Sequence, residues 1–166
     1  MNRQHLGIIG LGVMGRNLAL NAESKGFPVA GFDVDANKRA QVAESVHGKK
    51  IVVANSLQDF TQALETPRRI WMMVPAGKPV DAVLHDLQPS LSPEDILIDG
   101  GNSYFKDTER RAKELEAAGL RFFGMGVSGG DIQLLSSKQG DERLNAVDST
   151  GRTQSPTAVE APLAPT

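Results

Sequence analysis

The sequence predicts a doubly wound α/β fold, in which helices cover both faces of a parallel sheet. Short β-branched or apolar runs alternate with longer amphipathic runs between Gln4 and Gly126, as such a sheet requires. A glycine-rich turn follows the first apolar run and opens the first amphipathic one. The 166 residues are 40% hydrophobic and 23% charged, which is ordinary globular composition and sufficient for a core.

Six strands are predicted from runs that are apolar or β-branched and are bounded by Gly, Pro, Asp or Asn. In order they are Leu6–Ile9, Val29–Phe32, Ile51–Val53, Ile70–Val74, Ile96–Ile98 and Phe122–Gly124.

Five helices are predicted between these strands. Met14, Leu18 and Ala22 recur at every fourth position and define the first, which Gly26 ends. Asp35 is a good N-cap for a second helix over residues 36–46.

Ser56, with Asp59 three residues later, predicts the start of the third helix. Pro79 suits the first turn of the fourth. The fifth is predicted over Asp107–Ala118 and ends at Gly119, where a left-handed conformation costs little.

The character of the chain changes after Gly130. The last 36 residues contain no aromatic side chain and are rich in Ser, Thr, Gln, Asp and Pro. We therefore expect one folded domain over residues 1–130 and a divergent, irregular and disordered tail over residues 131–166.

Composition also narrows the functional classes. A net charge of -2 without a long run of one sign argues against a nucleic-acid partner, and no apolar run is long enough to span a membrane. The chain has no cysteine, which excludes disulfides and thiolate metal sites, and we expect no metal and a cytoplasmic location.

The glycine-rich turn has the pattern G-x-G-x-x-G and comprises Gly10, Leu11, Gly12, Val13, Met14 and Gly15. Directly after a strand and before a helix, Gly10 allows the tight turn, Gly12 the approach of a pyrophosphate, and Gly15 close packing of helix on strand. This context predicts a Rossmann-like dinucleotide-binding fold. The alternative is a glycine-rich turn without a ligand.

An acidic residue is expected about 20 positions later, at the end of the second strand, where it accepts hydrogen bonds from the adenosine ribose. Asp33 has this position, and its alternative role is a simple strand-end or capping residue, for which Asp35 is better placed. A carboxylate repels a 2'-phosphate, so we expect NAD to be preferred. NADP stays an alternative because Lys38 and Arg39 are close enough in sequence to meet its 2'-phosphate. Both side chains are also consistent with the solvent-exposed face of a helix.

Two further segments follow predicted strands. Asp99-Gly100-Gly101-Asn102-Ser103 lies at the edge where ligands of this fold bind, and its amide can orient a substrate or nicotinamide, but it is also an ordinary turn sequence. Gly126-Val127-Ser128-Gly129-Gly130 formally matches the nucleophile elbow of α/β-hydrolases.

The order of the catalytic triad argues against a hydrolase. In α/β-hydrolases the serine comes first along the chain, followed by the acid and then the histidine. The only histidines, His5, His47 and His85, all precede Ser128. A serine followed by two glycines can instead donate hydrogen bonds to an anionic substrate.

Taken together, these segments resemble the 6-phosphogluconate dehydrogenase family. The resemblance covers residues 3–130 and is carried by five segments in the same order: residues 10–15, Arg16-Asn17-Leu18-Ala19-Leu20-Asn21, Glu65-Thr66-Pro67-Arg68-Arg69, Ile98 to Ser103, and Gly126 to Gly130. It implies the N-terminal dinucleotide-binding domain of an enzyme that oxidises and decarboxylates 6-phosphogluconate to ribulose 5-phosphate in the pentose phosphate pathway.

The resemblance also implies roles for individual residues. Residues 10–15 would hold the pyrophosphate. The ribose end of the cofactor would be held by Asp33, Val34 and Asp35, and the cofactor would be lined by Val74, Pro75 and Ala76. Asn102 would touch cofactor and substrate, while Ser128, Gly129 and Gly130 would bind the sugar acid.

The chain departs from the family pattern in two places. NADP-using members commonly carry Asn-Arg followed by Ser or Thr where this chain has Asp33-Val34-Asp35, which resembles the NAD-preferring branch. The family's catalytic lysine and glutamate, and the helical domain that builds its homodimer, have no counterpart here. We therefore expect no catalytic acid or base, no activity of the fragment alone, and no homodimer.

Two other functions stay open from sequence alone. One is a dinucleotide-binding module without catalysis, and the other is a related 3-hydroxyacid dehydrogenase. The segments Glu65 to Arg69 and Asp99 to Asn102 favour the phosphogluconate branch.

Overall fold

The computed structural model describes residues 3–126, which form a six-stranded parallel sheet with helices on both faces. The strands are β1 (Leu6–Ile9), β2 (Val29–Phe32), β3 (Ile51–Val53), β4 (Arg69–Met72), β5 (Ile96–Asp99) and β6 (Arg121–Gly124). Their order in the sheet is β3-β2-β1-β4-β5-β6, and all neighbouring strands are parallel. The predicted doubly wound Rossmann-like fold is confirmed.

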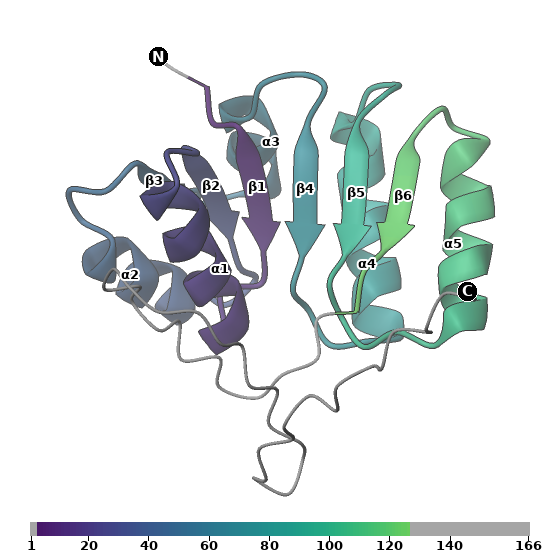
Figure 1. Ribbon diagram of the computed structural model, residues 1–166, viewed down its shortest axis with the longest axis horizontal. Coiled ribbons are helices and arrows are strands. Elements are labelled where there is room, and N and C mark those ends of the chain that lie inside the picture. The colour runs from purple at the N-terminus through teal and green to yellow at the C-terminus, as the bar shows by residue number, and fades with distance from the viewer. Residues whose placement is uncertain (1–2, 127–166) are drawn as a thin grey trace, which may run out of the picture. The chain divides into compact units, whose positions relative to one another are not determined.

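Each crossover between strands contains a helix. The helices are α1 (Val13–Ser24), α2 (Ala36–Ser45), α3 (Leu57–Ala63), α4 (Lys78–Leu87) and α5 (Phe105–Glu116), and a 3-10 turn, η1 (Gln88–Ser90), follows α4. Figure 1 shows α1 and α2 in front of the β1 side of the sheet and α3 and α4 behind it.

Two apolar layers hold the helices to the sheet. Phe60, Leu84 and Leu115 bring α3, α4 and α5 into one buried cluster with Ile70 and Leu97 of the central strands. On the other face, α1 and α2 pack through a smaller cluster around Ile8, Ala19 and Val42. The strands read as nearly continuous apolar runs because helices cover the sheet from both sides.

The cap residues behave as the sequence predicts. The carboxylate of Asp35 accepts hydrogen bonds from the N–H groups of Asn37 and Lys38, and the Ser56 hydroxyl accepts one from Asp59 N–H. Gly26 and Gly119 both have positive φ, at 90° and 76°, just after α1 and α5.

Several element boundaries differ from the prediction by one or two residues, most clearly those of the fourth strand and the fifth helix. The fourth strand ends at Met72 rather than Val74, although Met73 N–H still donates to the Ile9 carbonyl. The fifth helix begins at Phe105 rather than Asp107, because Tyr104 has extended backbone and serves as N-cap while Asp107 lies in the first turn. Aspartate is favoured both at the N-cap and in the first turn of a helix. The presence of Asp107 alone therefore does not show which residue begins the helix.

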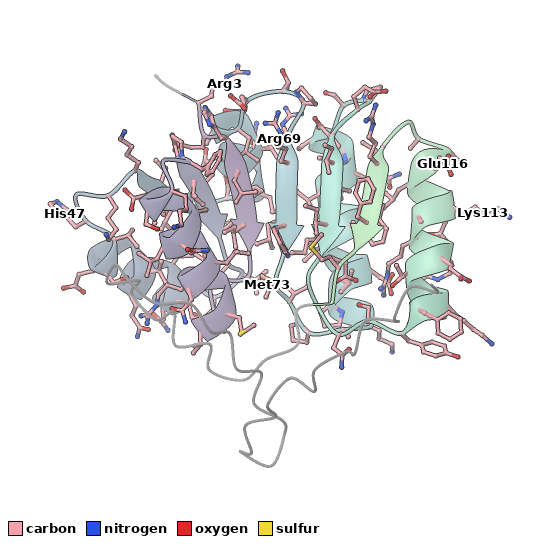
Figure 2. The ribbon with its side chains drawn as sticks, in the orientation of Figure 1. Arg3, His47, Arg69, Met73, Lys113 and Glu116 are labelled. Atoms are coloured by element: carbon pink, nitrogen blue, oxygen red, sulfur yellow. The ribbon has the colours of Figure 1, made fainter. Side chains whose placement is uncertain are left out.

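The carboxyl ends of all six strands meet along one edge of the sheet. Figure 2 shows Met73 at this edge, just past the end of β4, and Arg69 at the opposite edge. Ligands of doubly wound sheets bind outside the carboxyl edge, where the strand order reverses, which here is between β1 and β4. In the described part of the chain no helix is long and apolar enough to cross a membrane.

Candidate functional site: a glycine turn and two loops at the carboxyl edge

The turn between β1 and α1 begins at a residue that must be glycine. Gly10 has φ 93°, and a Cβ added there would overlap the Met73 carbonyl oxygen. Its N–H donates to the Phe32 carbonyl at 2.8 Å, so the chain leaves β1 tightly against its neighbouring strands. The tight turn assigned to Gly10 is thus explained by its geometry.

Gly12 and Gly15 differ sharply in their surroundings. Gly12 is the N-cap of α1, and a Cβ added there would have no atom within 4 Å. A Cβ on Gly15 would overlap the Gly10 carbonyl oxygen, so Gly15 is needed for the packing of α1 on the turn. The open space above Gly12 lies at a helix N-terminus without a side-chain cap, a setting that suits an anion.

Asp33 ties this turn to the end of β2. Its carboxylate is buried, with Oδ2 accepting a hydrogen bond from Leu11 N–H at 2.8 Å and Oδ1 accepting one from Asp35 N–H at 2.9 Å. Each carboxylate oxygen can accept a second hydrogen bond, so these contacts leave acceptor capacity for a ribose hydroxyl. The sequence did not reveal that Asp33 also fixes the glycine turn.

The residues that follow Asp33 include an arginine, Arg39, whose guanidinium is already hydrogen-bonded to the backbone. Val34 is 82% exposed, and Asp35 is occupied as the cap of α2. The Arg39 guanidinium donates to the carbonyls of Asp33 and Val34 and lies 5.5 Å from the centre of the Phe32 ring. Arg39 is therefore held by the backbone beside it.

A hollow of about 240 Å³ lies next to Gly12, between the glycine turn and α2. Its lining residues are Leu11, Gly12, Val13, Arg16, Lys38, Gln41 and Val42. Two of these residues, Arg16 and Lys38, are cationic, so the charge of the hollow favours an anionic group.

Val74, Pro75 and Ala76 lie in the loop that leaves β4, because the strand ends at Met72 and not at Val74 as predicted. A Cβ on Gly10 would lie 3.2 Å from Val74 Cγ1, and a Cβ on Gly101 would lie 3.1 Å from the Val74 carbonyl oxygen. Val74 therefore lies between the glycine turn and the loop after β5, and the structure brings these three predicted segments together.

The loop after β5 is organised by Asp99, whose side chain is fully buried. Its Oδ1 accepts a hydrogen bond from Gly101 N–H at 3.0 Å, and its Oδ2 accepts one from the Ser103 hydroxyl at 2.6 Å. Asn102 is exposed on this folded loop. The asparagine is thus presented to solvent by a turn that two hydrogen bonds to Asp99 hold.

A second hollow, of about 310 Å³, borders the same loop. Asn102 and Ser103 line it on one side, and Gly124, Met125 and Gly126 line it where the chain leaves β6. Ser128, Gly129 and Gly130, predicted to bind the sugar acid, lie outside the described residues. The same is true of the predicted tail over residues 131–166.

Sequence reasoning missed one buried cation. Arg111 of α5 is 1% exposed and donates to both oxygens of Asp81 in α4, from Nε at 2.8 Å and from Nη2 at 3.2 Å. The hydrogen bond from Arg111 is the largest cause that lowers the pKa of Asp81 to about 2, and the same pair raises the pKa of Arg111. On a helix rich in charged residues, nothing in the pattern distinguishes Arg111 from its exposed neighbours.

No group of three or more metal-binding side chains occurs among the described residues.

Comparison with known proteins supports the fold and the family. A family model described as the NAD binding domain of 6-phosphogluconate dehydrogenase matches residues 5–139, which continues past the predicted end of the resemblance at Gly130. A decarboxylating 6-phosphogluconate dehydrogenase of Synechocystis is 55% identical over 132 residues, covering 79% of this chain and 27% of that protein. The Bacillus subtilis relative, named NADP(+)-dependent, is 50% identical over 131 residues, or 79% of this chain and 28% of that protein.

Among solved structures, the chain is similar to Plasmodium falciparum 6-phosphogluconate dehydrogenase, which was studied in its apo form and with its cofactor NADP+ or its substrate 6-phosphogluconate. The TM-score is 0.71 at 30% identity, covering 76% of this chain and 27% of that one. The chain thus spans little more than a quarter of the length of these relatives.

Proposed function

Because the chain belongs to the family of NAD binding domains of 6-phosphogluconate dehydrogenase, we propose that it binds NAD(P) as the dinucleotide-binding unit of a decarboxylating enzyme of that family. The reaction is the oxidation of 6-phosphogluconate and its decarboxylation to ribulose 5-phosphate. The bound dinucleotide supplies the hydride acceptor. The proposal includes a place in the pentose phosphate pathway and a cytoplasmic location.

The observation that carries the proposal is the contrast among the three glycines. Side chains at Gly10 and Gly15 would overlap protein atoms, whereas a side chain at Gly12 would meet nothing. A turn without a ligand explains the first two, but at residue 12, where φ is an ordinary -64°, it explains glycine only by the preference for glycine over alanine at an N-cap. A pyrophosphate seated above Gly12 supplies a stronger reason, because its oxygens must approach the backbone N–H groups closely.

We place the adenosine ribose at Asp33 and the nicotinamide half toward the loops after β4 and β5. With the phosphates on the glycine turn, the two halves of the dinucleotide would extend to opposite sides of it, because Asp33 lies on the β2 side of the turn and Val74 on its β4 side. Val74, Pro75 and Ala76 then line the cofactor, and Asn102 reaches both cofactor and substrate. Ser128, Gly129 and Gly130 are proposed to hold the sugar acid.

We further propose that NAD is preferred over NADP. Asp33 places a carboxylate where a 2'-phosphate would lie, and Arg39 is already held by two backbone carbonyls. Lys38 and Arg16, which line the hollow beside Gly12, are the cations that leave NADP binding accessible. Since the Bacillus subtilis relative is named NADP-dependent, the preference rests on these residues rather than on the family.

The proposal is tested by following backbone amide resonances of the full chain while NAD is added. We expect the amides of residues 10–15, Asp33, Val74 and Ala76 to shift in a saturable way, while those of Glu114 and Glu116, at the far end of α5, stay in place. A folded chain whose glycine-turn amides do not respond to NAD or NADP would contradict the proposed function.

A further inference from the structure

The buried guanidinium of Arg111 is hydrogen-bonded to the start of α4. Besides its two hydrogen bonds to Asp81, Arg111 donates from Nη2 to the Gly77 carbonyl at 3.0 Å. Gly77 is the N-cap of α4 and has φ 86°. It ends the loop that begins at Val74, so Arg111 fixes the far end of the loop that leaves β4.

The same guanidinium faces the loop that leaves β5. Its Nη1 lies 3.5 Å from Asp99 Oδ2, and the Asp99 carboxylate in turn holds Gly101 N–H and the Ser103 hydroxyl. Both charged side chains are almost completely buried, where charges are costly unless they are paired. Nη1 has no hydrogen-bond partner among the described residues, so Asp99 is the charge it faces.

Arg111 and Asp99 therefore connect two loops that belong to different crossovers. The segments joined are residues 74–77 and residues 99–103, which also touch directly where Gly101 approaches the Val74 carbonyl. The glycine turn is tied to Asp33 by a different contact, the hydrogen bond from Leu11 N–H to the Asp33 carboxylate. The polar contacts of Arg111 on the β4 and β5 side therefore share no residue with that hydrogen bond on the β2 side.

We propose that Arg111 is a positioning residue that sets the spacing of these two loops and thereby shapes the nicotinamide half of the site. The inference rests on the proposed function, since it assigns the β4 and β5 loops to that half of the dinucleotide. Arg111 acts through Gly77 and Asp99 and need not touch the ligand. Its removal should weaken binding of the nicotinamide half while leaving the adenosine half intact.

The test compares Arg111→Met with Arg110→Met in the full chain. Arg110 is the adjacent residue and also bonds Asp81, at 2.9 Å, but its side chain is 44% exposed and it also pairs with Asp107 and Glu114. Two probes are titrated into each folded variant: NADH, followed by the fluorescence of its reduced nicotinamide, and ADP-ribose, which lacks the nicotinamide.

For Arg111→Met we expect NADH affinity to fall about tenfold, because the loops would adopt the binding geometry only part of the time. The fluorescence of bound nicotinamide should change with it, whereas ADP-ribose affinity should stay unchanged. Arg110→Met should bind both probes as the unsubstituted chain does. An equal loss of both probes, or unchanged NADH binding by Arg111→Met, would overturn the inference.

If Arg111→Met does not fold, Arg111→Lys carries the test. Lysine keeps a positive charge near Asp99 but lacks the planar fork that reaches Asp81 and Gly77 together. We expect the same selective loss for NADH, to a smaller degree, and a loss that is absent or shared with ADP-ribose would refute the positioning role. If the unsubstituted chain binds neither probe, the proposed function itself fails and the inference fails with it.

Discussion

Adding a methyl group at Gly12 should weaken ligand binding without destabilising the fold. In Gly12→Ala the new Cβ would lie in open space, with no atom within 4 Å, on backbone with φ -64° and ψ -172°. That conformation is open to any L-residue. The free protein should accept the substitution, while a pyrophosphate lying against the Gly12 backbone should not.

The expected stability change is small because two effects oppose each other. Alanine is a poorer N-cap than glycine, but it also restricts the unfolded chain, which stabilises by about 0.4–1 kcal/mol. We expect a net change within about 1 kcal/mol, or a shift in Tm of at most about 4 °C for a domain of this size. NAD affinity should fall at least about tenfold, which corresponds to about 1.4 kcal/mol.

The assay pairs thermal unfolding with NAD titration, and Gly15→Ala is the matched control. A Cβ at Gly15 would overlap the Gly10 carbonyl oxygen, so this variant should lose about 1–3 kcal/mol of stability, as overpacked sites do. A folded Gly12→Ala chain that binds NAD as tightly as the unsubstituted chain would refute the assignment of the phosphate site. A strongly destabilised Gly12→Ala chain would refute the claim that the space is open.

Three further substitutions test the carboxylates of Asp33, Asp95 and Asp81. Asp33→Asn can no longer accept both backbone N–H groups, so it should lose about 1–3 kcal/mol of stability in denaturant titration, and NAD and NADP affinities should converge. Arg68→Met should lose about 3–5 kcal/mol in the same assay, because it leaves the Asp95 carboxylate buried without its cation. Asp81→Asn tests pH dependence: the folded pKa of Asp81 is about 2, below its ordinary 3.8, chiefly through the hydrogen bond from Arg111. Its ionised form thus stabilises the fold fully above about pH 4 and progressively less toward pH 2, so the stability advantage of the unsubstituted chain over the variant should shrink across that interval.

Each of these predictions has a clear contrary result. Arg69→Met removes the neighbouring arginine, whose pair with Glu65 is exposed, and should cost less than about 1 kcal/mol. Equal losses for the two arginine variants would contradict the importance of burying Asp95. A stability difference for Asp81→Asn that is constant from pH 5 to pH 2 would contradict the pKa assignment, and an unchanged nucleotide preference in Asp33→Asn would remove Asp33 from ribose recognition.

Much of the fold follows from local patterns in the sequence. The G-x-G-x-x-G turn predicts the junction of β1 and α1 because Gly10 has positive φ and Gly15 leaves room for α1 to pack on the turn. Asp35 and Ser56 predict helix starts because capping acts within three residues. The parallel sheet follows from the regular alternation of strands and helices, since parallel neighbours need a crossover.

The parts that sequence could not predict depend on long-range packing. Arg111 meets Asp81 across 30 residues, and Asp33 meets Leu11 across 22, so neither partner can be found from spacing. The motif Glu65-Thr66-Pro67-Arg68-Arg69 was useful only as a resemblance. In the structure, Arg68 pairs with the buried Asp95 at the edge opposite the glycine turn, so the motif contributes to stability there.

Calorimetric titration of the full chain with NAD, and separately with NADP, tests the central claim most directly. We expect one saturable site for NAD, with NADP binding more weakly at the same site. A chain that unfolds cooperatively, and is therefore folded, but shows no saturable binding of either dinucleotide would contradict the claim that the carboxyl edge of this sheet is a dinucleotide site.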